Sequence, residues 1–326
     1  MLDCYLHEDL AYPGGNALNV AAYSRLFFGG TAGFVGIMGD DRFAEHVRGV
    51  LDEIGVDGAR VRRVRGANGM AFVALDEDGD RRFVASNRGG VQAELRLRLS
   101  EADHEYLSGF DRVHTSVYSS LEPELPAIAE RGSRVSYDYS DDASPDVIRA
   151  TAPHVDVGFF SGGDRSDSEI DDLGRFAVAC GMGSAVVTRG ARGSVGFDAT
   201  SVRRTGIREV DAVDALGAGD AFLTGFLAAR AGGADLAGCL DVAAVSERSP
   251  ARCAGRSDTL CMRGTTHARR CCGDTRRRRG GLRRDSAVVR RRLDPAARAG
   301  AKPADAGDRR RDLCRRRTAS VRTRVV

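Results

Sequence analysis

The sequence of 326 residues has no tryptophan and one lysine, Lys302, and its apolar runs are short. No run approaches the roughly 20 apolar residues that a membrane-spanning helix needs. No basic stretch followed by an apolar one opens the chain, so no secretory signal is expected. These absences predict a cytoplasmic protein without a membrane partner.

The cysteines also lack the regular spacing of a metal site. Five of the eight lie after residue 250, and no Cys-x-x-Cys pair recurs among them. Their spacing therefore fits no zinc site. The other three, Cys4, Cys180 and Cys239, are isolated, as expected of reduced thiols in small buried positions.

Charge divides the chain into two parts. Residues 246–326 hold 25 Lys and Arg against 8 Asp and Glu, whereas residues 1–245 hold 24 against 38. The last part also has no Phe, Tyr or Trp and no sustained helical or strand periodicity. Such a composition buries too little apolar surface to offset the entropy of ordering. We expect a folded domain over 1–245 and an arginine-rich tail over 246–326.

Three interpretations of the tail remain open: a nucleic-acid-binding arm, a disordered appendix, and the out-of-frame translation of a GC-rich gene. We favour the last, because the change is abrupt and interrupts a helical pattern of Leu236, Leu240, Val242 and Ala243. Nucleic-acid binding is not expected, since no aromatic residues interleave with the arginines.

A glycine-rich turn leads into an apolar helix at residues 214–222, Asp-Ala-Leu-Gly-Ala-Gly-Asp-Ala-Phe. Gly217 and Gly219 allow positive φ, so that the amides of Gly217, Ala218 and Gly219 can converge on an anion at the helix N-terminus. A carboxylate beside such a site, Asp220, can accept the proton of an attacking hydroxyl. The alternative is that Asp220 only caps the helix.

A second glycine turn, Pro13-Gly14-Gly15-Asn16, also enters a helix. Asn16 and Asn19 are three residues apart, so their side chains can project in the same direction. Two carboxamides suit the hydroxyls of a sugar, because each amide both donates and accepts. The alternative, that Asn16 caps the helix, explains one asparagine but not both.

In these two segments the chain resembles the PfkB, or ribokinase-like, family of carbohydrate kinases. Two further segments resemble the family, namely Gly36-Ile-Met-Gly-Asp-Asp41 with Phe43, and Val186-Val-Thr-Arg-Gly190 with Gly193. The resemblance covers about residues 1 to 245 and is nearest to the fructoselysine 6-kinase type.

Elements of two kinds alternate along the chain. Apolar patterns predict strands at 31–38, 110–118, 133–139, 155–160, 184–188 and 193–198, helices at 41–54 and 165–180, and a hairpin of 69–76 with 81–86. This alternation predicts an α/β fold with a mostly parallel central sheet and helices on both faces. The resemblance implies a ribokinase-like sandwich with a small β lid, at about 60–90, over the sugar.

The start of the chain departs from the family. Members typically open with a strand that ends in a sugar-binding Asp, and Asp3 stands where that Asp would. Almost no room remains for the strand, so we expect a start further upstream or a truncation. The alternative for Asp3 is a solvated terminal residue.

The resemblance implies a role for each motif residue. Asp220 would be the general base; Gly217, Ala218 and Gly219 the anion hole; Asp3, Gly14, Gly15, Asn16 and Asn19 the sugar site; Thr188, Gly190 and Gly193 the nucleotide side. The last three also suit a plain β-turn. Mg²⁺ would arrive with ATP, and Asp214 would order the turn or lie by a monovalent cation such as K⁺, as in some members.

Four departures weaken the match. Ala215 stands where a hydroxyl residue is common in the family, and Thr224 stands where a smaller residue is usual. The segment Ser161-Gly-Gly-Asp164 matches the family's Asn-x-x-Glu segment only loosely. The tail has no counterpart of the family's last strands and helices. We expect ATP-dependent phosphorylation of a sugar hydroxyl, on fructoselysine, a fructosamine or another small sugar, with reduced activity and a homodimer through the lid. A sugar- or nucleotide-binding relative without turnover and a nucleic-acid-associated protein are the alternatives.

Overall fold

The structure is a computed structural model, and it describes residues 1–7, 9–75, 81–141, 143–207, 217–246, 262–263 and 322–325. Asp214 and Ala215, the loop between the two hairpin strands, and most of the tail lie outside these residues. Among the described helices, none is both long and apolar enough to span a bilayer.

A nine-stranded sheet forms the centre of the molecule, in the order β12-β11-β10-β9-β8-β7-β14-β3-β4. Every pair from β10 to β4 is parallel, and β11 alone runs in the opposite direction, so that it pairs antiparallel with both β10 and β12. The strands are β3 (Thr31–Met38), β4 (Asp57–Arg63), β7 (Arg112–Ser116), β8 (Arg134–Asp138), β9 (Val157–Ser161), β10 (Ser184–Thr188), β11 (Ser194–Asp198), β12 (Val202–Thr205) and β14 (Arg322–Val325). The predicted mostly parallel sheet is confirmed.

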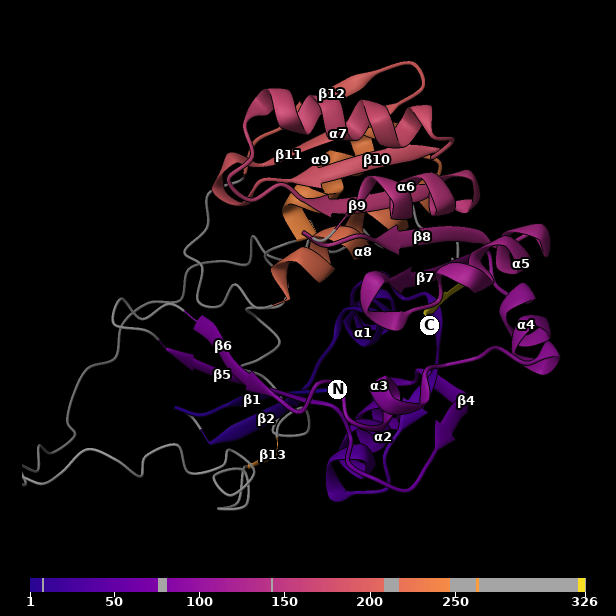
Figure 1. The fold of residues 1–326 in the computed structure, drawn as a ribbon, viewed down its shortest axis with the longest axis vertical. Helices are drawn as coiled ribbons and strands as arrows, with labels where there is room; N and C mark the ends of the chain where they lie inside the picture. The colour runs from indigo at the N-terminus through magenta and orange to yellow at the C-terminus, as the bar shows by residue number, and fades with distance from the viewer. Residues whose placement is uncertain are drawn as a thin grey trace, which may run out of the picture.

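Helices cover both faces of this sheet (Figure 1). One face carries α1 (Asn16–Phe28), α2 (Arg42–Ile54), α8 (Ala218–Ala231) and α9 (Leu236–Ser246). The other carries α3 (Val91–Leu95), α4 (Glu101–Ser108), α5 (Leu125–Glu130), α6 (Pro145–Thr151) and α7 (Asp167–Ala179). Alternate residues of β3 enter the two cores, since Phe34 packs on the first side and Val35 on the second.

A smaller sheet, β13-β2-β1-β5-β6, projects from the large one (Figure 1). Its strands are β1 (Leu2–Tyr5), β2 (Leu10–Pro13), β5 (Met70–Leu75), β6 (Arg81–Ser86) and β13 (Met262–Arg263). β5 and β6 form the predicted antiparallel hairpin. The sequence analysis had not placed β1 and β2 beside it, because nothing local to residues 2–13 indicates which strand they pair with.

Two short stretches of the tail form strands, which the sequence analysis did not predict. β13 pairs with β2, and β14 lies between β3 and β7, parallel to both. Pairing of this kind uses backbone N–H and C=O groups, which every residue other than proline supplies. Side-chain periodicity therefore gave no signal for it.

The sequence sets the helix ends through local hydrogen bonds. Asp41 accepts from the amide of Ala44 at 2.8 Å to begin α2, and Gly55 ends it in the left-handed region at φ 75°. Ser166 and Glu169 form a capping box that begins α7. Both helices were predicted from their apolar patterns, and these caps fix where both begin and where α2 ends.

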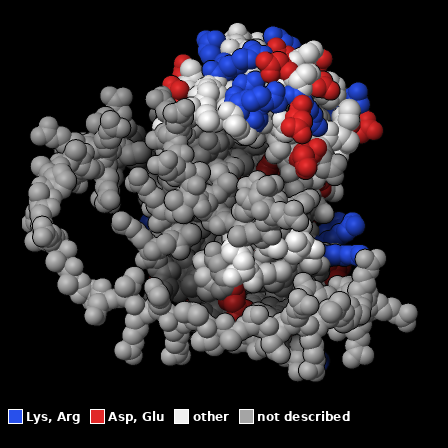
Figure 2. All heavy atoms as spheres, turned by 90° about the vertical axis from the view of Figure 1, so that its left-hand side faces the viewer, with Lys and Arg blue, Asp and Glu red and all other residues white. Residues whose placement is uncertain are grey.

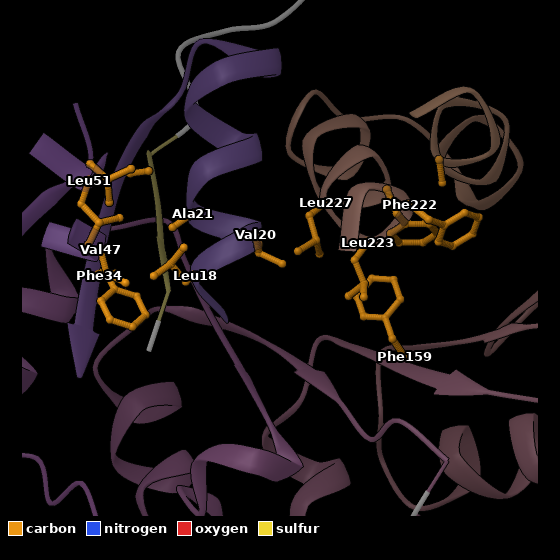
Figure 3. Packing of buried hydrophobic residues seen from close by; sticks show 14 of the residues in the cluster. Leu18, Val20, Ala21, Phe34, Val47, Leu51, Phe159, Phe222, Leu223 and Leu227 are labelled. Carbon is orange, nitrogen blue, oxygen red and sulfur yellow. The ribbon is translucent and has the colours of Figure 1, made fainter. Parts of the chain in front are cut away.

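Helix α1 packs against both α2 and α8, and so links the beginning of the domain to its last helices. Val20 points from α1 toward Leu227 of α8, while Leu18 lies nearer Phe34 of β3 (Figure 3). Leu223 and Phe159 extend the same cluster toward β9. This packing brings the N-termini of α1 and α8 together.

Charge on the described surface is mixed in sign. Basic and acidic side chains alternate at the top of the molecule (Figure 2). Ion pairs join such residues there, as Arg204 with Asp171 at 2.6 Å and Arg189 with Asp167 at 3.0 Å. The described side chains at this end of the molecule therefore form no patch of one sign in this view (Figure 2).

Two glycines inside helices provide a matched test of the packing. A Cβ on Gly174 of α7 would lie 2.2 Å from the buried ring of Phe197, whereas one on Gly49 of α2 meets nothing within 4 Å. Both Ala substitutions gain helix propensity of up to about 1 kcal/mol. We expect Gly49→Ala to raise the free energy of unfolding and Gly174→Ala to lower it by about 1–3 kcal/mol, measured by urea denaturation. Similar effects of the two substitutions would contradict this packing.

Candidate active site

The two glycine turns predicted from the sequence meet at one point. Gly15 precedes α1 with φ 101°, and Gly217 precedes α8 in the left-handed region with φ 79°. Neither helix has a side-chain cap. The capping alternatives for Asn16 and Asp220 are therefore wrong, and both side chains are directed elsewhere.

Asp220 is held by two amides from the first helix. The Nδ2 of Asn16 donates to Oδ1 of Asp220 at 2.8 Å, and the Nδ2 of Asn19 donates to Oδ2 at 2.7 Å. The main-chain oxygen of Asp220 accepts from Thr224 at 2.6 Å. The carboxylate thus has a fixed orientation. The two asparagine side chains project in the same direction, as predicted, but their amide nitrogens contact Asp220, and their role at the sugar stays a prediction.

A second carboxylate, Asp138, shares this arrangement, and the sequence analysis missed it. Asn16 Nδ2 also donates to Asp138 Oδ2 at 2.8 Å, while the amide of Ser140 donates to Oδ1 at 2.9 Å. Asp138 is the last residue of β8. Because ligands of parallel sheets bind at the carboxyl ends of strands, an acidic residue there was a usable signal.

His114 was also missed, and here the sequence offered no signal. It lies in β7, fully buried, with Nε2 3.0 Å from Asn16 Oδ1 and Nδ1 3.1 Å from Ser136 Oγ. Burial, followed by the positive charge of Arg112, lowers the pKa of His114 to about 3. The ring is therefore neutral in the folded protein.

Asp3 lies in β1 and is only 8% exposed, so the alternative of a solvated terminal residue is wrong. Its carboxylate lies against Gly14, where a Cβ would come within 1.9 Å of Oδ2. Gly14 therefore leaves room for Asp3 itself, in addition to any ligand. No larger residue fits there without moving the carboxylate.

All three carboxyl groups of the site have raised pKa values. Burial is the largest cause at each, and it raises the pKa of Asp220 to about 6, of Asp3 to about 6 and of Asp138 to about 7. The charge of Asp220 adds to the rise at Asp3 and Asp138, whereas the amides of Asn19 and Asn16 oppose the rise at Asp220. A carboxylate that titrates near neutrality is suited to accept a proton from a bound hydroxyl.

A cavity of about 240 Å³ opens beside Asp220. It is lined by Asp138, Phe159, Phe160, Ser161, Thr188, Gly217, Gly219, Asp220 and Leu223. Four residues from the predicted catalytic, anion and nucleotide segments thus face one space. A larger hollow of about 580 Å³ between β3, α2 and β4 includes none of the predicted site residues.

Gly190 and Gly193 do not line the cavity, although they adjoin Thr188. They flank a short 3₁₀ turn, η4 (Gly190–Arg192), with φ of 54° and 81°. A Cβ on Gly193 would lie 2.0 Å from the carbonyl oxygen of Thr205. The turn alternative accounts for both glycines, and they shape the end of β10 next to the cavity.

Among the described residues, no group of three or more His, Cys, Asp or Glu side chains could hold a metal ion. Mg²⁺ in kinases is bound chiefly by substrate phosphates and water, with one or two carboxylates. Asp138 and Asp220 are the carboxylates in the cavity lining, and Asp138 fits that need while leaving Asp220 for its predicted role as base.

The comparisons with known proteins agree with this geometry. A family model described as pfkB family carbohydrate kinase matches residues 6–247. The chain is 43% identical to fructosamine kinase FrlD of Bacillus subtilis over 70% of this chain and 80% of that one. It is 32% identical to fructoselysine 6-kinase of Escherichia coli, over 72% of this chain and 88% of that one. The resemblance found in the sequence, including its subfamily, is confirmed.

Solved structures share the fold. Ribokinase of Arabidopsis thaliana, complexed with ribose and ATP, superimposes with a TM-score of 0.64 at 22% identity, over 73% of this chain and 81% of that one. A ribokinase II from E. coli, in complex with ATP and Mg²⁺, gives 0.60 at 22% identity, over 73% and 82%. The predicted ribokinase-like sandwich is confirmed.

The neutral state of His114 can be tested through stability. Because the pKa of His114 is lowered to about 3, the unfolded chain binds a proton below about pH 6.5 that the native state does not. His114 therefore makes a destabilising contribution that grows as the pH falls from 7 to 5, and it opposes the contribution of the three buried carboxyl groups, whose raised pKa values make the folded state more favourable as the pH falls over the same range. His114→Gln keeps the carboxyl groups and lacks only the histidine contribution. We expect the free energy of unfolding of the variant, relative to wild type, to rise by about 2 kcal/mol between pH 8 and pH 5. Parallel pH dependences in urea unfolding would mean that His114 is protonated in the folded protein.

Proposed function

Because the chain belongs to the pfkB family of carbohydrate kinases, we propose that it transfers the γ-phosphoryl group of ATP to a hydroxyl of a fructosamine such as fructoselysine. The names of the two relatives, at 43% and 32% identity, support this substrate class. The observation that carries the proposal is the position of Asp220, which is fixed by two asparagines at the edge of a cavity that it shares with Thr188 and two helix-N-terminal glycines.

Asp220 is the general base of this proposal. It accepts the proton of the sugar hydroxyl while the hydroxyl oxygen attacks the phosphorus atom of the transferred group. Its pKa of about 6 leaves it ionised at neutral pH, and its two amide partners hold it in place without protonating it. The amides of Gly217, Ala218 and Gly219, at the start of α8, stabilise the charge on the phosphoryl oxygens.

The sugar lies on the side of α1 and β1. Asp3, Gly14, Gly15, Asn16 and Asn19 form this part of the proposed site. Asp3 and Asp138 add carboxylates, which suit both the hydroxyls and the cationic amine of a fructosamine. The burial of Asp3 and its contact with Gly14 support the assignment.

ATP enters from the side of β10, where Thr188 lines the cavity, and Gly190 and Gly193 shape the adjoining turn. Mg²⁺ carried in with ATP would neutralise the phosphates and would be held mainly by them and by water, with Asp138 as the carboxylate of the cavity lining that could help to hold it. We also propose a K⁺ site near Asp214, a residue that lies outside the described part of the chain.

Residues 1–245 are the proposed kinase domain, in line with the family match over 6–247. The small sheet is proposed to mediate a homodimer. Phe83 and Val84, neighbours on β6, are 65% and 53% exposed and point to opposite faces, and Leu6 adds a third exposed apolar side chain. One face can thus cover the sugar while the other meets a partner. A cytoplasmic location stays a prediction.

Substitution of the base tests the function directly. We expect Asp220→Asn to lower kcat by at least about 100-fold, because an amide cannot accept the proton. ADP release is measured with a fructosamine, with ribose and with fructose. Asp146→Asn, at an exposed ion pair on α6, is the control and should match wild type. Equal turnover by Asp220→Asn and wild type would remove the catalytic assignment.

Sedimentation velocity tests the dimer. Phe83→Asp places a charge on the small sheet and should shift the protein toward monomer, because a buried unpaired charge opposes association. Leu26→Asp, at an exposed leucine of α1 that is 44% accessible, is the matched control. A wild-type protein that sediments as a monomer at every concentration would contradict the proposal.

A further inference from the structure

His114 touches the proposed base only through another residue. Its Nε2 lies 3.0 Å from the amide oxygen of Asn16, and the amide nitrogen of that asparagine contacts both Asp220 and Asp138. Ser136 Oγ lies 3.1 Å from Nδ1 on the other side of the ring. The five side chains therefore form one continuous chain of hydrogen bonds, from β8 through β7 and α1 to α8.

When Asp138 and Asp220 are both ionised, only one pattern of hydrogens satisfies this chain. The two carboxylates need donors, so Asn16 must direct Nδ2 with both its hydrogens toward them and Oδ1 toward the histidine. His114 must then carry its proton on Nε2, and Nδ1 must accept from the hydroxyl of Ser136. The other acceptor for that hydroxyl, the carbonyl oxygen of Val113, is more distant at 3.4 Å.

We propose that His114 is a positioning residue that locks the amide of Asn16, so that one side chain delivers its two hydrogens to Asp138 and to Asp220. The proposal deepens the proposed function and rests on it only for the catalytic consequence. Without the lock, the amide can rotate about its terminal bond, and the hydrogen bonds to the two carboxylates lengthen or lose their alignment.

The consequence falls on the protonation of Asp220. A hydrogen bond donated to a carboxylate favours its ionised form, and that of Asn16 opposes the effect of burial at Asp220. The other charged groups around the network are Asp3 from β1, Asp138 from β8, and Arg112, two residues before His114. None of them is removed by a substitution at His114, so the change at Asp220 can be attributed to the amide.

The test measures the pKa of Asp220 directly, by the ¹³C chemical shift of its carboxyl carbon over a pH titration of the full chain. His114→Leu removes the Nε2–H donor and should raise the pKa of Asp220 by about one unit. His114→Gln places an amide nitrogen near the position of Nε2 and should restore the pKa to that of wild type. Thr115→Val, at a buried neighbour in β7 whose hydroxyl has no partner among the described residues, should also leave the pKa unchanged.

The pH dependence of kcat/KM is the second measurement. Because the base must be ionised, a higher pKa moves the acid limb of the profile to higher pH, so the deficit of His114→Leu should be about fivefold at pH 6 and should shrink toward pH 8. A purely structural role would lower the whole profile by a constant factor. If the carboxyl shift appears without any turnover, the kinase assignment fails and the positioning role stands.

Ser136→Ala is a second variant, which tests the proposal even if the His114→Leu protein does not fold. It removes the hydroxyl that sets the ring's tautomer, and it should raise the pKa of Asp220 by a smaller amount in the same direction. An unchanged pKa of Asp220 in His114→Leu, or in Ser136→Ala when the first variant is unfolded, would overturn the proposal. Failure of His114→Gln to restore the wild-type value would overturn it as well.

Discussion

The site depends on one carboxylate held by two amides from the opposite end of the domain. Asp220 lies in the first turn of α8, while Asn16 and Asn19 lie on α1, about two hundred residues earlier in the chain. Their hydrogen bonds and the packing of Val20 on Leu227 join the same two helices. The helix N-termini therefore cannot separate without leaving a buried carboxylate unpaired, which costs more than the bonds themselves contribute.

The same arrangement lowers the stability of the fold. Asp3, Asp138 and Asp220 lie close enough for their charges to interact, and burial disfavours the ionised form of each. His114 is kept neutral in the same region. A protein selected only for stability would place apolar residues there, so this concentration of buried ionisable groups marks a functional site.

The sequence predicted most of what depends on local chemistry. The central strands, the hairpin and the helices at 41–54 and 165–180 follow from apolar periodicity, and the two glycine turns follow from their own spacing, whereas β4, β12 and the short helices α3 to α6 were not predicted. His114 could not be found in this way, because its importance comes from its contact with Asn16, about a hundred residues away. Asp138 did carry a signal, since it lies at the end of a parallel strand, but its link to Asn16 appears only in the fold. The pairing of β1 with β5 and the position of β14 were not predicted for a related reason, because pairing between backbone groups does not determine the pattern of side chains.

The most direct measurement of the central claim is a crystal structure of the chain with a fructosamine and a non-hydrolysable ATP analogue. If Asp220 is the base, the acceptor hydroxyl will lie within roughly 2.6–3.2 Å of one of its carboxylate oxygens, and the terminal phosphate will face the amides of Gly217 and Gly219. A hydroxyl bound to Asp138 instead, with Asp220 still turned to its two asparagines and away from the sugar, would contradict the account.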